Sequence, residues 1–114
     1  MKKSESSKEA RTEAKRAKYY EILADTDPKE LAMVAGIIDG AVFCEVEMED
    51  LRRLPFIVTK PGDPSKQKVT PAARQYQKTQ AMHANNIRIL LNVLRKVESD
   101  ATNELLKRLE EFTL

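Results

Sequence analysis

The chain has 114 residues, of which 41% are apolar, 33% are charged and 5% are aromatic, with no tryptophan. This composition is typical of one helical domain with a thin core, and it argues against a dense α/β enzyme with a deep small-molecule pocket. Cys44 is the single cysteine, which excludes an internal disulfide and favours a reducing compartment. No run of about 18 apolar residues is present, so we expect no membrane span.

The net charge of +2 is distributed unevenly along the sequence. It is +4 over residues 1–18, −6 over 19–54, +4 over 55–78 and zero over 79–114. Such alternation serves either solubility or the binding of a charged partner. We therefore expect a basic, partly disordered N-terminal arm over residues 1–18 and a helical domain over residues 19–114.

The N-terminal arm begins with Lys, Ser and Glu residues, and residues 1–7 are expected to be disordered because they have no apolar partner. A helix is predicted from Lys8 to Ala24, where good helix formers predominate. Its apolar side chains gather at the end, which predicts a helix docked by its C-terminal turns. They are Tyr19, Tyr20, Ile22 and Leu23.

A long helix is predicted from Asp27 to Leu54. Asp27 is a suitable N-cap with Pro28 at the first helical position, and Leu54 precedes Pro55, which disfavours further helix. Apolar residues recur at steps of three and four between these ends, so one face is expected to be buried over about 40 Å. Gly36 and Gly40 lie one turn apart in this helix, where they mark either a weak point or a close helix contact within or between subunits.

Residues 56–69 form the non-helical part of the sequence. The stretch from Phe56 to Thr59 favours a strand, and the turn residues from Lys60 to Pro64 separate it from a second short apolar–polar stretch. The sequence therefore predicts a small β-hairpin or an ordered loop with a basic tip.

A second long helix is predicted from Pro71, with Thr70 as its N-cap. Its apolar stripe extends to Phe112, either as one helix of about 60 Å or as two helices that break near Ser99 and Asp100. The fold class is thus all-α, with two long antiparallel helices as its centre. The last apolar residues outreach a partner of about 40 Å, so we expect another subunit to cover them. The candidate oligomer contacts are Gly36, Gly40, Ala101, Leu105, Leu109 and Phe112.

No sequence motif indicates catalysis, a cofactor or a metal site. There is no P-loop, no dinucleotide-binding fingerprint, no H-E-x-x-H and no C-x-x-C, and one His with one Cys cannot form a structural zinc site. His83 is expected to be a structural or a surface residue, and Cys44 to be a small core residue. Glu45 and Glu49 share a helix face, which is expected to be solvated or, as the less favoured alternative, to receive a basic arm from a neighbouring subunit.

Nucleic acid is the partner that the basic segments favour, because lysine and arginine side chains neutralise phosphates. Neither segment interleaves aromatic residues, so base stacking is not indicated, and each subunit is expected to bind weakly. The candidate DNA-binding residues are Lys2, Lys3, Lys8, Arg11, Lys15, Arg16, Lys18, Lys60, Lys66 and Lys68.

The order of these parts resembles the small subunits of phage terminases over residues 19–98. The resemblance lies in the run FCEVEMEDL from Phe43 to Leu51, a short extended stretch with a Lys/Gly/Pro turn, and VTPAARQY from Val69 to Tyr76. A polar helix then follows, through Asn85, Asn86 and Ile87 into Leu90, Leu91 and Leu94. The sequence departs from the family in having no evident N-terminal helix-turn-helix and little room for a C-terminal motor-binding tail.

The resemblance implies a non-enzymatic homo-oligomeric ring in the host bacterial cytoplasm. Such a protein binds viral DNA and regulates the large terminase subunit. Two alternatives remain open from the sequence: a helical interaction or assembly factor that binds no nucleic acid, and an enzyme whose acidic helix holds a divalent metal.

Overall fold

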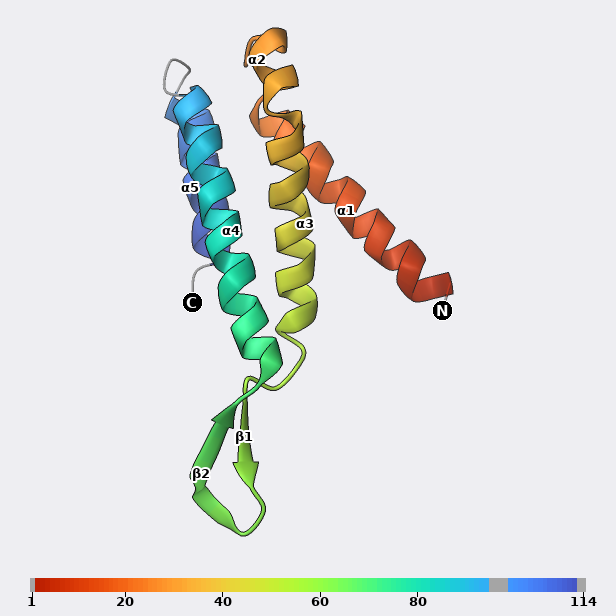
Figure 1. Cartoon of the computed structure of the whole chain (residues 1–114). Coiled ribbons are helices and arrows are strands. Elements are labelled where there is room, and N and C mark those ends of the chain that lie inside the picture. The colour runs from red at the N-terminus through yellow and green to blue at the C-terminus, as the bar shows by residue number, and fades with distance from the viewer. Residues whose placement is uncertain (1, 95–98, 113–114) are drawn as a thin grey trace.

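The computed structural model describes residues 2–94 and 99–112, and side chains within residues 7–93 and 101–112. The described residues are mostly helical, with one small antiparallel sheet (Figure 1). The elements in chain order are α1 (Lys2–Ile22), α2 (Pro28–Met33), α3 (Ala35–Leu51), β1 (Ile57–Lys60), β2 (Asp63–Val69), α4 (Pro71–Leu94) and α5 (Ser99–Glu111).

The molecule is elongated, with principal extents of 59 × 33 × 20 Å. Helices α3 and α4 run antiparallel along its length, and the hairpin of β1 and β2 projects beyond their ends (Figure 1). Helix α1 packs on α3 and diverges from it toward the N-terminus, while α5 returns along α4. The prediction of a small hairpin between two helices is confirmed, and the second long helix is divided in two.

Local capping chemistry places two helix starts where the sequence predicts them. The Asp27 side chain accepts a hydrogen bond from the backbone N–H of Lys29 at 2.9 Å, and α2 begins at Pro28. The Thr70 hydroxyl accepts from the N–H of Ala73 at 3.2 Å, and α4 begins at Pro71. In both cases a side-chain oxygen satisfies a free N–H at the start of a helix.

Two expected boundaries are wrong. The helix expected from Asp27 to Leu54 divides at Val34, whose φ of −103° and ψ of 8° leave the α region, and α3 ends at Leu51. A buried β-branched side chain at this position, followed by Gly36, weakens the helix locally. Helix α1 begins at Lys2 rather than at Lys8, because its first residues include no Gly or Pro to stop it.

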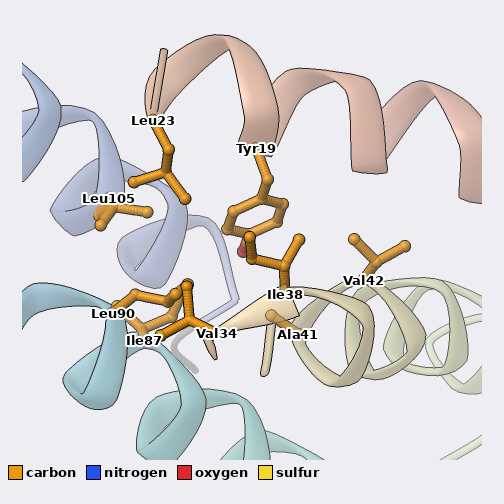
Figure 2. Packing of buried hydrophobic residues seen from close by; sticks show 9 residues of the cluster. All are labelled: Tyr19, Leu23, Val34, Ile38, Ala41, Val42, Ile87, Leu90 and Leu105. Carbon is orange, nitrogen blue, oxygen red and sulfur yellow. The ribbon is translucent and has the colours of Figure 1, made fainter. Parts of the chain in front are cut away.

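The main core lies where α1, α3, α4 and α5 meet (Figure 2). Tyr19 of α1 lies next to Ile38 of α3, Leu23 follows the last residue of α1, and Leu105 of α5 and Leu90 of α4 belong to the same cluster. A second cluster nearer the hairpin contains Cys44, Met48, Tyr76 and Phe112. Both clusters include residues of the C-terminal segment.

The expectation of an uncovered C-terminal face is therefore wrong. Leu105 is 0% exposed and Phe112 is 5% exposed within the single chain, and Ala101 and Leu109 pack against the main core. The physical reason is the break between α4 and α5, which lets α5 fold back instead of extending past α3. These apolar residues stabilise the subunit itself.

Candidate nucleic-acid interface

Four basic residues of α1 are paired with acidic residues of α3. Of these carboxylates only Glu49 belongs to the helix face that the sequence predicts to be acidic, and all of them come from the same chain as the cations. The N···O distances are 3.0 Å for Lys8–Glu47, 3.0 Å for Arg11–Glu49 and Arg11–Asp50, 2.7 Å for Lys15–Glu49 and 2.9 Å for Arg16–Asp39. These four cations are therefore engaged within the fold.

The other candidates in the basic arm add little free charge to a DNA-binding surface. Lys18 pairs with Glu21 inside α1 at 3.6 Å. The side chains of Lys2 and Lys3 lie outside the described residues, so these two candidates stay predictions. Among the described residues, the cations without an acidic partner therefore lie outside the N-terminal arm.

The sequence suggests that Glu45 belongs to a solvated acidic face. This expectation is wrong, because the Glu45 side chain is fully buried. Its Oε2 accepts hydrogen bonds from the Tyr19 hydroxyl and lies 3.0 Å from His83 Nε2, while its Oε1 lies 3.2 Å from Arg108 Nε. Lys15 Nζ approaches the same carboxylate at 3.7 Å. Side chains from α1, α4 and α5 thereby converge on one carboxylate of α3.

The electrostatics of this cluster favour the ionised form of Glu45. Burial acts to raise the pKa of its carboxyl, but hydrogen bonds from His83 and Tyr19 and the positive charge of Arg108 hold that pKa below its ordinary value. The same burial and the adjacent carboxylate raise the pKa of the Tyr19 hydroxyl, which stays protonated as a donor. Of the two expectations for His83, a structural or a surface residue, the structure shows the first, since His83 is buried beside Glu45.

The hairpin presents a different environment, because its lysines stand in solvent. Lys60, Lys66 and Lys68 are exposed, and within the described part of the chain no carboxylate lies within 4.0 Å of their ammonium groups. Asp63 is turned to the local backbone, where it accepts hydrogen bonds from the Ser65 N–H at 3.2 Å and the Ser65 hydroxyl at 2.6 Å. Three of the predicted DNA-binding residues thus remain free.

Further unpaired cations lie next to the hairpin and were missed in the sequence. Arg74 and Lys78 are exposed on the first turns of α4, which follows β2 directly, and Arg53 is exposed just before β1. We call these three residues, together with the three hairpin lysines, the basic surface. The signal was present in the sequence, since residues 52–88 contain eight Lys or Arg residues and a single acidic residue.

Arg52 shares this segment but has a structural role. Its Nε donates to the Tyr76 hydroxyl at 2.8 Å and its Nη2 donates to the Glu111 carbonyl at 3.1 Å. Its guanidinium lies 5.4 Å from the ring centres of Tyr76 and Phe112. Arg52 therefore ties the end of α5 to α3 and α4, and we leave it out of the basic surface.

The two glycines proposed as interface residues have different surroundings. A Cβ at Gly40 would lie 3.1 Å from Asn86 Nδ2 of α4, so this glycine serves close packing within the subunit. A Cβ at Gly36 would meet nothing within 4 Å. One turn after Gly40, Phe43 is 57% exposed, and Met82 on α4 is 53% exposed.

Comparisons of the chain with protein families, with curated proteins and with solved structures found no match. Of the helices that the structure describes, none combines the length and apolar character needed to cross a bilayer. Among the described residues, no group of three or more His, Cys, Asp or Glu side chains is arranged to hold a metal ion.

Proposed function

We propose that this chain is a non-catalytic, oligomeric DNA-packaging protein of the kind that the terminase small subunits represent. In this role it binds viral DNA and regulates a large terminase subunit. The observation that supports the proposal best is the basic surface, where six exposed cations at one end of the molecule have no acidic partner among the described residues. Polyanions bind such a surface by releasing counterions.

The number of cations sets the expected strength of binding. The logarithm of the affinity for duplex DNA falls with the logarithm of salt concentration by about 0.9 for each phosphate neutralised, so six contacts correspond to a slope of about −5. One such surface binds weakly at physiological salt. Several copies in a ring raise the overall affinity by avidity, which accords with an oligomer.

One structural feature supports self-association. Phe43 on α3 and Met82 on α4 are each more than half exposed. Apolar surface of this kind is typical of protein contacts.

The DNA-binding part of the proposal is tested by fluorescence anisotropy with a labelled duplex between about 50 and 200 mM salt. The test variant replaces Lys60, Lys66 and Lys68 with Gln. The control variant replaces three exposed lysines distant from the hairpin, Lys18, Lys29 and Lys107, with Gln, so that both variants have the same net charge.

We expect the test variant to lose most of its affinity and to show a salt slope reduced by about 2 to 3, while the control variant binds nearly as the unmodified chain does. Equal losses in the two variants would mean that net charge, not the basic surface, determines binding. An unmodified chain that does not bind DNA would favour the alternative of a helical interaction or assembly factor.

Self-association is tested by light scattering coupled to size exclusion. We expect a mass that is a multiple of the 13.0 kDa subunit, and a smaller assembly when Phe43 is replaced by Glu. Truncation before Ala101 is unsuitable for this purpose, because it would remove Leu105 and Phe112 from the two core clusters. A monomer at all concentrations would contradict the ring.

A further inference from the structure

We propose that the β1–β2 hairpin enters the major groove of duplex DNA, with the start of α4 placed against the flanking phosphates. This inference rests on the proposed DNA-binding function and specifies its ligand as double-stranded. It follows from the shape of the hairpin, from the side chains on its two faces and from the position of the remaining cations.

The hairpin has the shape of a ribbon that stands clear of the helices (Figure 1). All four residues of β1 and six of the seven in β2 are exposed, so neither face is covered by the chain itself. Seven extended residues span about 23 Å. The major groove of B-DNA is about 12 Å wide and admits a two-stranded β-ribbon, whereas the minor groove is about half as wide.

The pairing register distributes hydrogen-bonding and apolar groups over the ribbon. Thr59 is opposite Gln67 and Ile57 is opposite Val69, so these four side chains share one face. An amide such as that of Gln67 can bind the N6 and N7 edge of adenine, and apolar side chains can contact the methyl group of thymine. Both the N6 and N7 edge of adenine and the methyl group of thymine face the major groove.

The opposite face contributes a basic edge. Val58 is opposite Lys68, and Lys66 lies two residues from Lys68 on the same strand and shares its face. A lysine ammonium can bind the O6 and N7 atoms of guanine or a phosphate beside the groove. Both faces therefore carry groups suited to a duplex.

The hairpin lacks the features that bind single strands. Sequence-tolerant binding of single-stranded nucleic acid uses aromatic side chains on which bases stack. The strands β1 and β2 contain no aromatic residue. Phe56, at the base of the hairpin, packs on Tyr76 with a ring-centre distance of 5.3 Å.

The remaining cations lie where the DNA backbone would pass. Arg53 precedes the hairpin, and Arg74 and Lys78 follow it within the first eight residues of α4. A ribbon inside the groove therefore places cations of the helical body beside the phosphates on its rim. This arrangement divides the basic surface into groups that reach base edges and groups that position the protein.

The test is a methylation-interference experiment on the full chain with a long duplex treated with dimethyl sulfate. This reagent methylates guanine N7 in the major groove and adenine N3 in the minor groove, so one reaction reports on both grooves. We expect methylated guanines to be depleted from the bound fraction and methylated adenines to be retained. The single strand of the same sequence should bind at least tenfold more weakly than the duplex.

Two variants assign the effect to the hairpin. Gln67→Ala removes no charge, so the salt slope should stay unchanged while the affinity for the same duplex falls about tenfold. Asn92→Ala removes an exposed amide at the far end of α4 and should bind as the unmodified chain does. Circular dichroism confirms that each variant is folded, because both side chains lie outside the core.

The outcomes separate this inference from the proposed function. Duplex binding with interference at adenine N3, or with no interference, would overturn insertion into the major groove and leave DNA binding intact. Equal affinity for the single strand would also overturn it. Failure to bind any DNA would overturn both proposals.

Discussion

The strongest prediction concerns Glu45, because four partners from three helices meet at its buried carboxylate. The change we consider is Glu45→Gln, which keeps the shape of the side chain and removes its charge. The carboxylate lies 3.0 Å from His83, 3.2 Å from Arg108 and 3.7 Å from Lys15, and it accepts a hydrogen bond from Tyr19. All of these groups lose a charged partner in the variant.

The expected cost follows from burial. Glu45 is 0% exposed, and removing one partner of a buried ion pair typically lowers the free energy of unfolding by about 3 to 5 kcal/mol. Gln retains part of the hydrogen bonding, so we expect about 3 kcal/mol. The total free energy of unfolding of a domain of this size is about 5 to 15 kcal/mol. The midpoint of thermal unfolding should therefore fall by roughly 10 °C or more.

The matched control is Glu47→Gln, two residues along the same helix. The Glu47 side chain is 30% exposed and its partner Lys8 is 49% exposed, so this surface pair contributes only about 0 to 1 kcal/mol. Urea unfolding followed by circular dichroism measures both variants. If the two substitutions change the unfolding free energy equally, the argument that the carboxylate of Glu45 organises the helices is wrong.

The same residue predicts a dependence on pH. The pKa of Glu45 is lowered in the folded state, so its contribution to stability is fully present above the unfolded value of about 4.3 and is lost as pH falls below it. The unfolding free energy of the unmodified chain should therefore decrease as the pH falls below about 4.3. The Glu45→Gln variant should show a smaller decrease over the same range.

Three further predictions concern α1, the cysteine and the glycines. Raising salt to about 1 M reduces the Debye length to about 3 Å and weakens the ion pairs between α1 and α3. Amide hydrogen exchange over residues 8–16 should then accelerate more than exchange next to buried Tyr19. Uniform acceleration would contradict ionic attachment of the start of α1. Burial and nearby carboxylates raise the pKa of the Cys44 thiol, so it should react with Ellman's reagent only after unfolding in urea, and rapid reaction in the native state would contradict its burial. Gly36→Ala should raise the unfolding free energy by about 0.5 kcal/mol, because its Cβ would meet nothing within 4 Å. Gly40→Ala should raise it less or lower it, because its Cβ would lie 3.1 Å from Asn86 Nδ2. An equal increase for both variants in urea unfolding would mean that the Asn86 side chain moves away freely.

The elements that the sequence predicts well are those that depend on neighbouring residues. Thr70 and Pro71 begin a helix because a hydroxyl beside a fixed φ angle satisfies the first free N–H groups. The hairpin follows from a strand-forming stretch and a turn in which Gly62 takes a φ of +82°, a conformation that other residues rarely adopt. These preferences operate over a few residues, so sequence alone is sufficient to identify them.

The basic surface was predictable only in part. Its three hairpin lysines were identified from charge and turn residues, while Arg53, Arg74 and Lys78 were passed over in favour of the N-terminal arm. The charge of the arm gave no indication of its partner. Which cations are free depends on which carboxylates lie opposite them, and that pairing joins residues almost forty positions apart in the chain.

The amino-acid sequence by itself determined the helical character, the hairpin and the helix starts at Pro28 and Pro71, because capping, turn geometry and apolar periodicity are local. Only the tertiary structure decided that Glu45 is buried, that α1 lies on the acidic face of α3, and that α5 folds back to cover Leu105 and Phe112. A carboxylate on a helix has the same local preferences whether it faces water or a neighbouring helix. Its environment is determined by which helix faces meet, and that choice depends on the free energy of the whole packed arrangement.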